Sequence, residues 1–207
     1  MKHHSLLMSG AMVRQTLNGS KTMTRRMLKS PTDTARWAKG DLLYVREAWR
    51  TSASLDPVKP SSLAQGTRVS YEASDNAPAS VLRGKLRPGM FMPRWASRLT
   101  LQVEDVSYER LQDITEDDAL AEGIVENKVI VGAACHGGRH IELTGIRYFN
   151  PAGHPHDEGH EDAISAFKDL WTGINGEESW EENPYVSVTT FKTFHCNIDQ
   201  WRPENVT

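Results

Sequence analysis

The alternation of residues 98–106 constrains the fold of this chain most strongly. Every second position of this segment is apolar and the positions between are polar, which is the pattern of a β-strand with one buried face. The apolar members are Leu99, Leu101 and Val103, and the polar members are Thr100, Gln102 and Glu104. A domain built around such a strand needs further strands to pair with it.

Further strands are expected where β-branched and aromatic residues gather, at 41–49, 68–73 and 185–194. Three helices are expected between them, at about 9–17, 115–122 and 161–175, and each has a capping residue or a terminating glycine. Helices scattered singly among strands favour a small β-barrel or curled sheet with flanking helices, of the mainly β, α+β class. A doubly wound parallel sheet is not expected, because it would need a regular βα alternation that this sequence lacks.

Two segments look like insertions or loops in what we expect to be a single domain. Residues 51–66 are rich in Ser, Pro and Ala and lack periodicity, and residues 124–160 contain several Gly and Pro clusters. We therefore predict no regular element in either segment.

Composition narrows the location of the protein. The 207 residues include two cysteines, so a disulfide framework is not expected, and no apolar run approaches the roughly 18 residues that cross a membrane. We expect a cytoplasmic protein that makes no use of a membrane.

Charge is distributed unevenly along the chain. Residues 1–100 hold 17 Lys and Arg against 6 Asp and Glu, whereas residues 101–207 hold 7 against 21. Five cations without an intervening acid follow one another at Arg83, Lys85, Arg87, Arg94 and Arg98. Such clustering is typical of a phosphate-bearing partner, although a basic half that folds against an acidic half gives the same count.

The densest candidate site is Gly19-Ser20-Lys21-Thr22-Met23-Thr24-Arg25-Arg26. A helix ends there, and cations and hydroxyls follow at once, which suits an anionic or polar ligand. A turn-like backbone would set Lys21 and Thr24 on one side, whereas a straight strand would set them on opposite faces. The alternative is that the threonines are ordinary strand residues and the cations only solvate a sheet edge.

This segment resembles the Gly-x-Lys-Thr-x-Thr-x-Arg signature of the ASCH domain family, whose fold is a PUA-like β-barrel. Further similar blocks follow in order at 40–47, 92–98, 111–116 and 167–191. The whole set is most similar to the larger ASCH proteins of bacteriophages and prophages. The resemblance implies a PUA-like barrel over 1–207, with the segments 51–66 and 124–160 inserted.

The resemblance also implies a chemistry. Some compact ASCH proteins are amidohydrolases that remove the acetyl group of N4-acetylcytidine with a Lys, a Thr and a Glu, which correspond here to Lys21, Thr24 and Glu122. Thr24 would be the nucleophile, Lys21 its base and Glu122 the proton donor, without a metal. Other ASCH proteins are linked to RNA binding or cleavage, so a non-catalytic module for RNA or single-stranded nucleic acid, or a ribonuclease, is the alternative.

We expect the substrate, a modified nucleoside, nucleotide or nucleic acid, to be bound mainly by basic and aromatic side chains. Trp49 and Tyr71 are candidates for stacking on a base. The predicted substrate-binding residues are Arg25, Arg26, Arg46, Glu47, Trp49, Tyr71, Arg94 and Arg98.

Residues 135–160 are rich in possible zinc ligands, but their spacing matches no known zinc motif. We therefore expect a polar loop with no cofactor, and keep zinc as the less favoured alternative. The possible ligands are Cys135, His136, His140, His154, His156 and His160.

Overall fold

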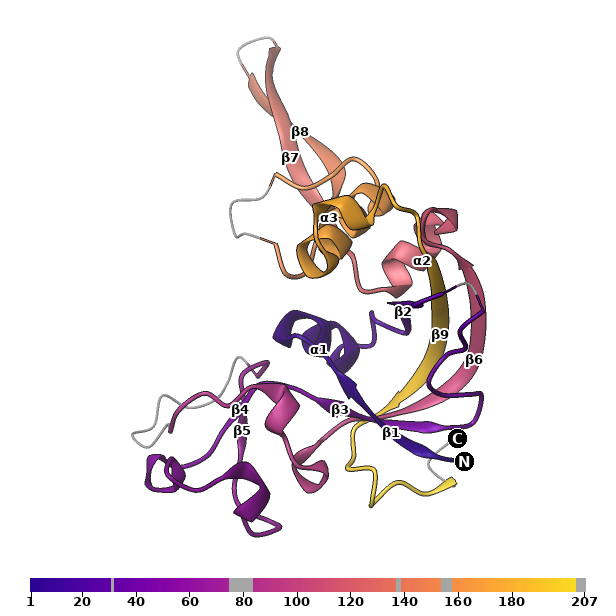
Figure 1. Ribbon diagram of the computed structural model, residues 1–207. Helices are drawn as coiled ribbons and strands as arrows, with labels where there is room; N and C mark the ends of the chain where they lie inside the picture. Colours follow the sequence, from indigo (N-terminus) through magenta and orange to yellow (C-terminus); the bar gives the residue numbers. More distant parts are fainter. Residues whose placement is uncertain (31, 75–83, 137–138, 154–157, 204–207) are drawn as a thin grey trace.

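A five-stranded sheet forms the centre of the protein (Figure 1). The structure is a computed structural model that describes residues 1–30, 32–74, 84–136, 139–153 and 158–203. The strand order is β1-β3-β6-β9-β2, with β1 and β3 parallel and the other neighbours antiparallel. The strands are β1 (His3–Leu7), β2 (Met23–Met27), β3 (Leu42–Arg46), β6 (Thr100–Arg110) and β9 (Tyr185–Phe194).

The alternation in β6 is confirmed on its apolar face, where Leu101 and Val103 are buried. The opposite face of β6 is more deeply buried than its polar residues suggest. Thr100 on that face is fully buried, because the C-terminal segment packs there and Cys196 accepts a 2.9 Å hydrogen bond from the Thr100 hydroxyl. A register shift between Val103 and Asp105 interrupts the pairing with β9, and such bulges increase the bend of a sheet. Figure 1 shows β6 and β9 curving together along their length.

Three α-helices confirm the capping signals of the sequence: α1 (Gly10–Leu17), α2 (Glu116–Ala121) and α3 (Ala163–Asn175). The side chains of Ser9, Thr115 and Asp162 accept backbone N–H groups at their N-termini. In α3, the apolar stripe of 163–171 packs against α2 and β9, as its spacing predicts. Ile174, at the end of the same stripe, is 58% exposed.

The fold is α+β and mostly strand, as the sequence predicts. Within the described residues, β1 pairs only with β3 and β2 only with β9, so the sheet is open. The PUA-like barrel remains a prediction.

The segments 51–66 and 124–160, which we expected to be irregular insertions, differ in secondary structure. Residues 51–66 contain only short 3-10 turns, at Ala53–Leu55 and Pro60–Ser62, and lie beside the short strands β4 (Trp49–Arg50) and β5 (Ser70–Tyr71). The prediction of an irregular segment at 124–160 was wrong. A long antiparallel hairpin, β7 (Val125–His136) with β8 (Arg139–Phe149), projects beyond α3 (Figure 1). Its strands are rich in β-branched residues, and a Gly-Gly pair between such runs is a hairpin signal that we interpreted only as a breaker.

The remaining 3-10 turns, Gly89–Phe91, Arg94–Ala96, Leu111–Asp113 and Glu177–Ser179, connect these elements. In the part of the chain that the structure describes, none of the helices has the length and apolar character needed to cross a membrane.

Candidate functional site

The segment between α1 and β2 places Lys21 inside the protein. Helix α1 ends at Leu17, and Gly19 turns the chain with a φ of 84°, a conformation that glycine adopts without strain. Backbone hydrogen bonds then tie Lys21 to Gln15 of α1 (2.9 Å) and Thr22 to Ala121 of α2 (2.9 Å). Because β2 starts only at Met23, Lys21 does not follow the alternation of the strand and its side chain is completely buried.

Glu122 meets Lys21 from the end of α2. It is the C-cap of this helix, and the chain leaves through Gly123 at a φ of 99°. The Lys21 Nζ donates to Glu122 Oε2 at 2.6 Å and to the Glu122 backbone oxygen at 2.8 Å. The Glu122 side chain is only 4% exposed, so this ion pair is shielded from water on both sides.

Arg25 holds the same carboxylate from β2. Its guanidinium lies 3.5 Å from Glu122 Oε1, and it donates to Glu109 Oε1 at 2.7 Å and to Asp118 Oδ2 at 2.9 Å. With three carboxylates around it, Arg25 is buried and fully engaged within the protein. Arg25 also lines the pocket that Glu122 borders, so the predicted substrate contact of Arg25 stays a prediction.

Burial lowers the pKa of Lys21 below its ordinary value, because a charged ammonium loses its hydration. The charge of Glu122 and its hydrogen bond act in the opposite direction, and the neighbouring Arg26 and Arg25 lower the pKa further. The net direction is downward, which brings the amine closer to use as a base.

Thr24 and Glu122 open onto one pocket of about 390 Å³, which we call the Thr24 pocket. Thr24 is one residue beyond Met23 on β2 and is 5% exposed. Most of the remaining wall is apolar and comes from α1 and α3: Met8, Met12, Phe167, Leu170, Trp171 and Ile174. Lys21 does not line this pocket; it is hydrogen-bonded to Glu122, which does.

Comparisons with known proteins give no match. No protein-family model, no curated protein and no solved structure matches this chain. The function is therefore argued from the geometry of the Thr24 pocket and from its surroundings.

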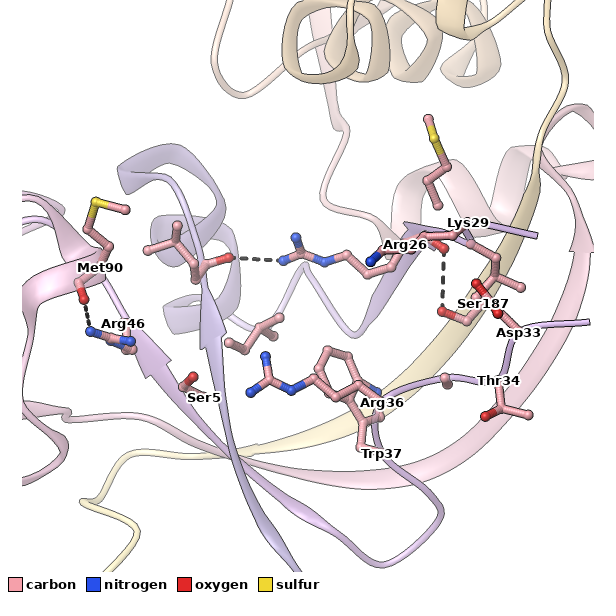
Figure 2. A pocket seen from close by; sticks show the side chains of 15 residues that line it. Ser5, Arg26, Lys29, Asp33, Thr34, Arg36, Trp37, Arg46, Met90 and Ser187 are labelled. Atoms are coloured by element: carbon pink, nitrogen blue, oxygen red, sulfur yellow. Dashed lines mark hydrogen bonds between the residues drawn. The ribbon is translucent and has the colours of Figure 1, made fainter. Parts of the chain in front are cut away.

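The structure brings five of the predicted site residues together and separates the rest. Thr24, Arg25, Arg26 and Glu122 line the Thr24 pocket, and Lys21 lies behind Glu122, to which it is hydrogen-bonded. Arg46 lies in the wall of a neighbouring pocket, next to Met90 and across the pocket from Arg26 (Figure 2).

The predicted aromatic platform is part of the protein interior. Trp49 has no exposed surface and packs in a separate core cluster, so it cannot stack on a base as we predicted. Tyr71 lies beneath Arg98, whose guanidinium carbon is 4.1 Å from the ring centroid. Arg98 donates to both oxygens of Glu47, at 2.8 and 2.9 Å. Glu47, Tyr71 and Arg98 thus satisfy one another outside the Thr24 pocket.

Arginines of the basic run at 83–98 are also bound by other residues of the chain. Arg94 donates to Asp199 Oδ1 at 2.6 Å, and Arg87 is buried and donates to the carbonyl oxygens of Leu55 and Val58. Arg83 lies outside the described residues. Of these arginines, Arg94 pairs with the acidic half through Asp199, whereas Arg87 and Arg98 are bound by partners within residues 1–100. The alternative of one half folding against the other therefore accounts for Arg94 alone.

Sequence reasoning missed the acids around Arg25 and the aromatic wall of the Thr24 pocket. Glu109 and Asp118 lie 84 and 93 positions from Arg25, and no local pattern links them. Phe167 and Trp171 were recognised only as the buried face of a helix, and that face also borders the pocket.

A metal centre finds no support among the described residues, where no three His, Cys, Asp or Glu side chains come together as ligands. His154 and His156 lie outside those residues, and His160 pairs through its backbone with Tyr148. The expectation of no cofactor stays a prediction.

Proposed function

We propose that this protein is an amidohydrolase that removes an acyl group from the exocyclic amine of a modified cytidine. The observation that carries this proposal is the buried Lys21–Glu122 pair, whose carboxylate lines the same pocket as the Thr24 side chain. A hydroxyl, an amine with lowered pKa and a carboxyl group are the parts that acyl transfer through a threonine requires.

The proposed mechanism needs a neutral amine on Lys21 and a proton on Glu122, and the 2.6 Å contact between them gives a direct path for that proton. Burial lowers the pKa of Lys21, which favours release of its proton. The total number of protons on the pair is unchanged.

The reaction then proceeds in two steps. Thr24 Oγ1 bonds to the acyl carbon while Lys21 accepts the hydroxyl proton, and the bond between the acyl carbon and nitrogen breaks as Glu122 protonates the departing amine. Water next attacks the acyl-threonine ester and gives a proton to Glu122, the ester bond breaks, and Thr24 regains a proton from Lys21. The carboxylic acid and the free cytidine amine leave.

The pocket wall favours an apolar, flat part of the substrate next to Thr24. Phe167 and Trp171 line the pocket but are only 2% and 4% exposed, so they give a base an apolar boundary and little stacking surface. The resemblance of the sequence to ASCH amidohydrolases supplies the particular candidate, N4-acetylcytidine. A PUA-like barrel is the fold that accompanies this proposal.

The test is a panel of acylated nucleosides incubated with the purified protein, with the free base and the released acid measured together. We expect release of acetate from N4-acetylcytidine, retention of activity in Thr24→Ser, and loss in Thr24→Val, which keeps the branched shape and removes the hydroxyl. Circular dichroism and thermal unfolding check that the Thr24→Val variant is folded.

The competing function is a module that binds nucleic acid without catalysis. It predicts no release of acetate from any member of the panel, and equal binding of oligonucleotides by the intact protein and by Thr24→Val. That pair of results would overturn the hydrolase.

A further inference from the structure

A second pocket of about 500 Å³ adjoins the Thr24 pocket and is lined by four cations (Figure 2). We call it the basic pocket and define it by Arg26, Lys29, Arg36 and Arg46. Figure 2 shows the guanidinium groups of Arg26 and Arg36 extending in the same direction across the pocket, with Arg46 on the other side. Its one acidic lining residue is Asp33.

Arg26, Lys29 and Arg36 of the basic pocket are exposed and form no ion pair within the described residues, although the nearby Glu122 carboxylate acts on Arg26 at longer range. Among the described residues, Lys29 and Arg36 form no ion pair, Arg26 donates only to the Leu7 carbonyl oxygen at 3.0 Å, and Arg46 donates to the Met90 carbonyl oxygen. Asp33 accepts the backbone N–H of Ser30 at 3.1 Å and caps its own turn. Arg25, by contrast, is matched by three carboxylates.

The wall of this pocket also contains an unsatisfied donor. The Nε–H of Arg46 is buried and has no acceptor in the described part of the chain. Four other buried donors of the described residues, among them Arg87 Nε, are also unpaired, so the argument rests on the combination. Clustered cations with an available N–H donor beside them suit an anionic ligand. The hydroxyls of Ser5, Thr34 and Ser187 line the same space and add further hydrogen-bonding groups.

The two pockets share a wall made of Leu7, Arg26 and Met27. A ligand with its base beside Thr24 therefore has the basic pocket as its neighbour on the side of Arg26. In a nucleotide, the group that follows the base and the sugar is a phosphate, and arginines bind phosphate oxygens through two parallel N–H groups.

From this juxtaposition we infer that the basic pocket binds a phosphate ester of the substrate, so that the preferred substrate is a nucleotide and not a free nucleoside. This inference rests on the proposed function for the position of the base. The phosphate is either the terminal group of a mononucleotide or the linkage of a polynucleotide, and both present the same oxygens to the arginines.

Calorimetric titration of the full chain tests the inference without requiring turnover. The ligands are cytidine, cytidine 5′-monophosphate, cytidine 3′-monophosphate and a short cytidine oligonucleotide, none of which carries an acyl group. We expect at least one phosphate-bearing ligand to bind roughly tenfold or more tightly than cytidine, and its advantage to shrink as salt is raised. If a mononucleotide already binds more tightly than cytidine, the bound group is a terminal phosphate. If only the oligonucleotide binds more tightly, the bound group is an internal phosphate linkage.

Variants test whether the tighter binding of phosphate-bearing ligands depends on the basic pocket. Arg36→Ala and Lys29→Ala should each reduce the advantage of the phosphate ligand over cytidine. Arg68→Ala is the matched control, since Arg68 is exposed and lies outside both pockets. Equal binding of cytidine and every phosphate ligand, no binding of any phosphate ligand, or an Arg68→Ala effect as large as that of Arg36→Ala would overturn the inference. Failure of the hydrolase proposal appears separately, as an absence of acetate release in the nucleoside panel.

Discussion

Lys21 and Glu122 are 101 positions apart in the chain, and the Lys21 Nζ lies 2.6 Å from Glu122 Oε2 in the buried centre of the protein. Neither residue has a structural need for this arrangement, because removing two charges from water costs several kcal/mol per ion unless strong contacts offset the loss. The contact is held from both ends, by the turn after α1 and by the end of α2. Glu122 lines the Thr24 pocket, and under the proposed function the pair transfers protons there.

The first prediction concerns this pair. Lys21→Met leaves the Glu122 carboxylate buried without its nearest cation and should lower the free energy of unfolding by about 3–5 kcal/mol. Adding Glu122→Gln removes the stranded charge, so the double variant should recover part of that loss while remaining inactive. Urea unfolding of the two single variants and the double variant gives the coupling energy, and strictly additive losses would show that the pair does not interact.

The second prediction separates proton donation by Glu122 from a structural role. Glu122→Gln cannot protonate a leaving amine, so hydrolysis of N4-acetylcytidine should fall by about 10²–10⁴-fold. An acetyl ester whose leaving group needs no proton should acylate Thr24 with a much smaller loss, although deacylation, which also uses Glu122, slows for both substrates. Comparing the rate of leaving-group release in the first turnover for the two substrates makes the distinction, and equal losses on both would assign Glu122 to structure alone.

The third prediction is a pH dependence. The mechanism uses the pair with one shared proton, so raising the pH through the lowered pKa of Lys21 removes that proton and the donor for the leaving amine with it. Activity should therefore decline on the alkaline side at a pH below the ordinary lysine value of about 10.4. The measurement is kcat across the alkaline range in wild type, with thermal unfolding at each pH as the control. A rate that keeps rising up to the ordinary lysine value would contradict the lowered pKa.

The fourth prediction uses two glycines with similar backbones. Gly123 has a φ of 99°, and a Cβ there would lie 3.1 Å from Gln15 Cβ and 3.3 Å from Lys21 Cβ. Gly66 has a φ of 85° and open space around the same position. Alanine at either site costs on the order of 1–3 kcal/mol of backbone strain, but only Gly123→Ala should also displace Lys21 and reduce turnover.

Thermal unfolding and kcat are measured for Gly123→Ala and Gly66→Ala to test this fourth prediction. Loss of turnover in Gly66→Ala, or full turnover in Gly123→Ala, would show that the position of Lys21 does not depend on this contact.

The sequence predicted the elements whose signals are local. Thr115 with Asp118 forms the capping box that begins α2, and 185–194 is the strand β9 as expected. The strands β1 and β2 were missed, because His3–Leu7 and Met23–Met27 are short and polar and become strands only through pairing with β3 and β9.

The same division applies to the site. The residues Lys21 and Thr24 stand in one short motif and could be found by spacing, whereas Glu122 was found only through a family resemblance. The basic pocket could not be predicted, because it gathers side chains from β2, β3 and the segment between them. The run of cations that the sequence singled out instead serves ion pairs and carbonyl contacts inside the chain, because arginines close in sequence need not share a surface.

The central claim, an acyl group carried on Thr24, is tested most directly by partitioning with hydroxylamine. N4-acetylcytidine and an acetyl ester are each hydrolysed in the presence of hydroxylamine, and the ratio of acetohydroxamate to acetate is measured. A common acyl-Thr24 intermediate predicts the same ratio for both substrates and neither product from Thr24→Val. Different ratios, or no acetate from wild type, would contradict the account.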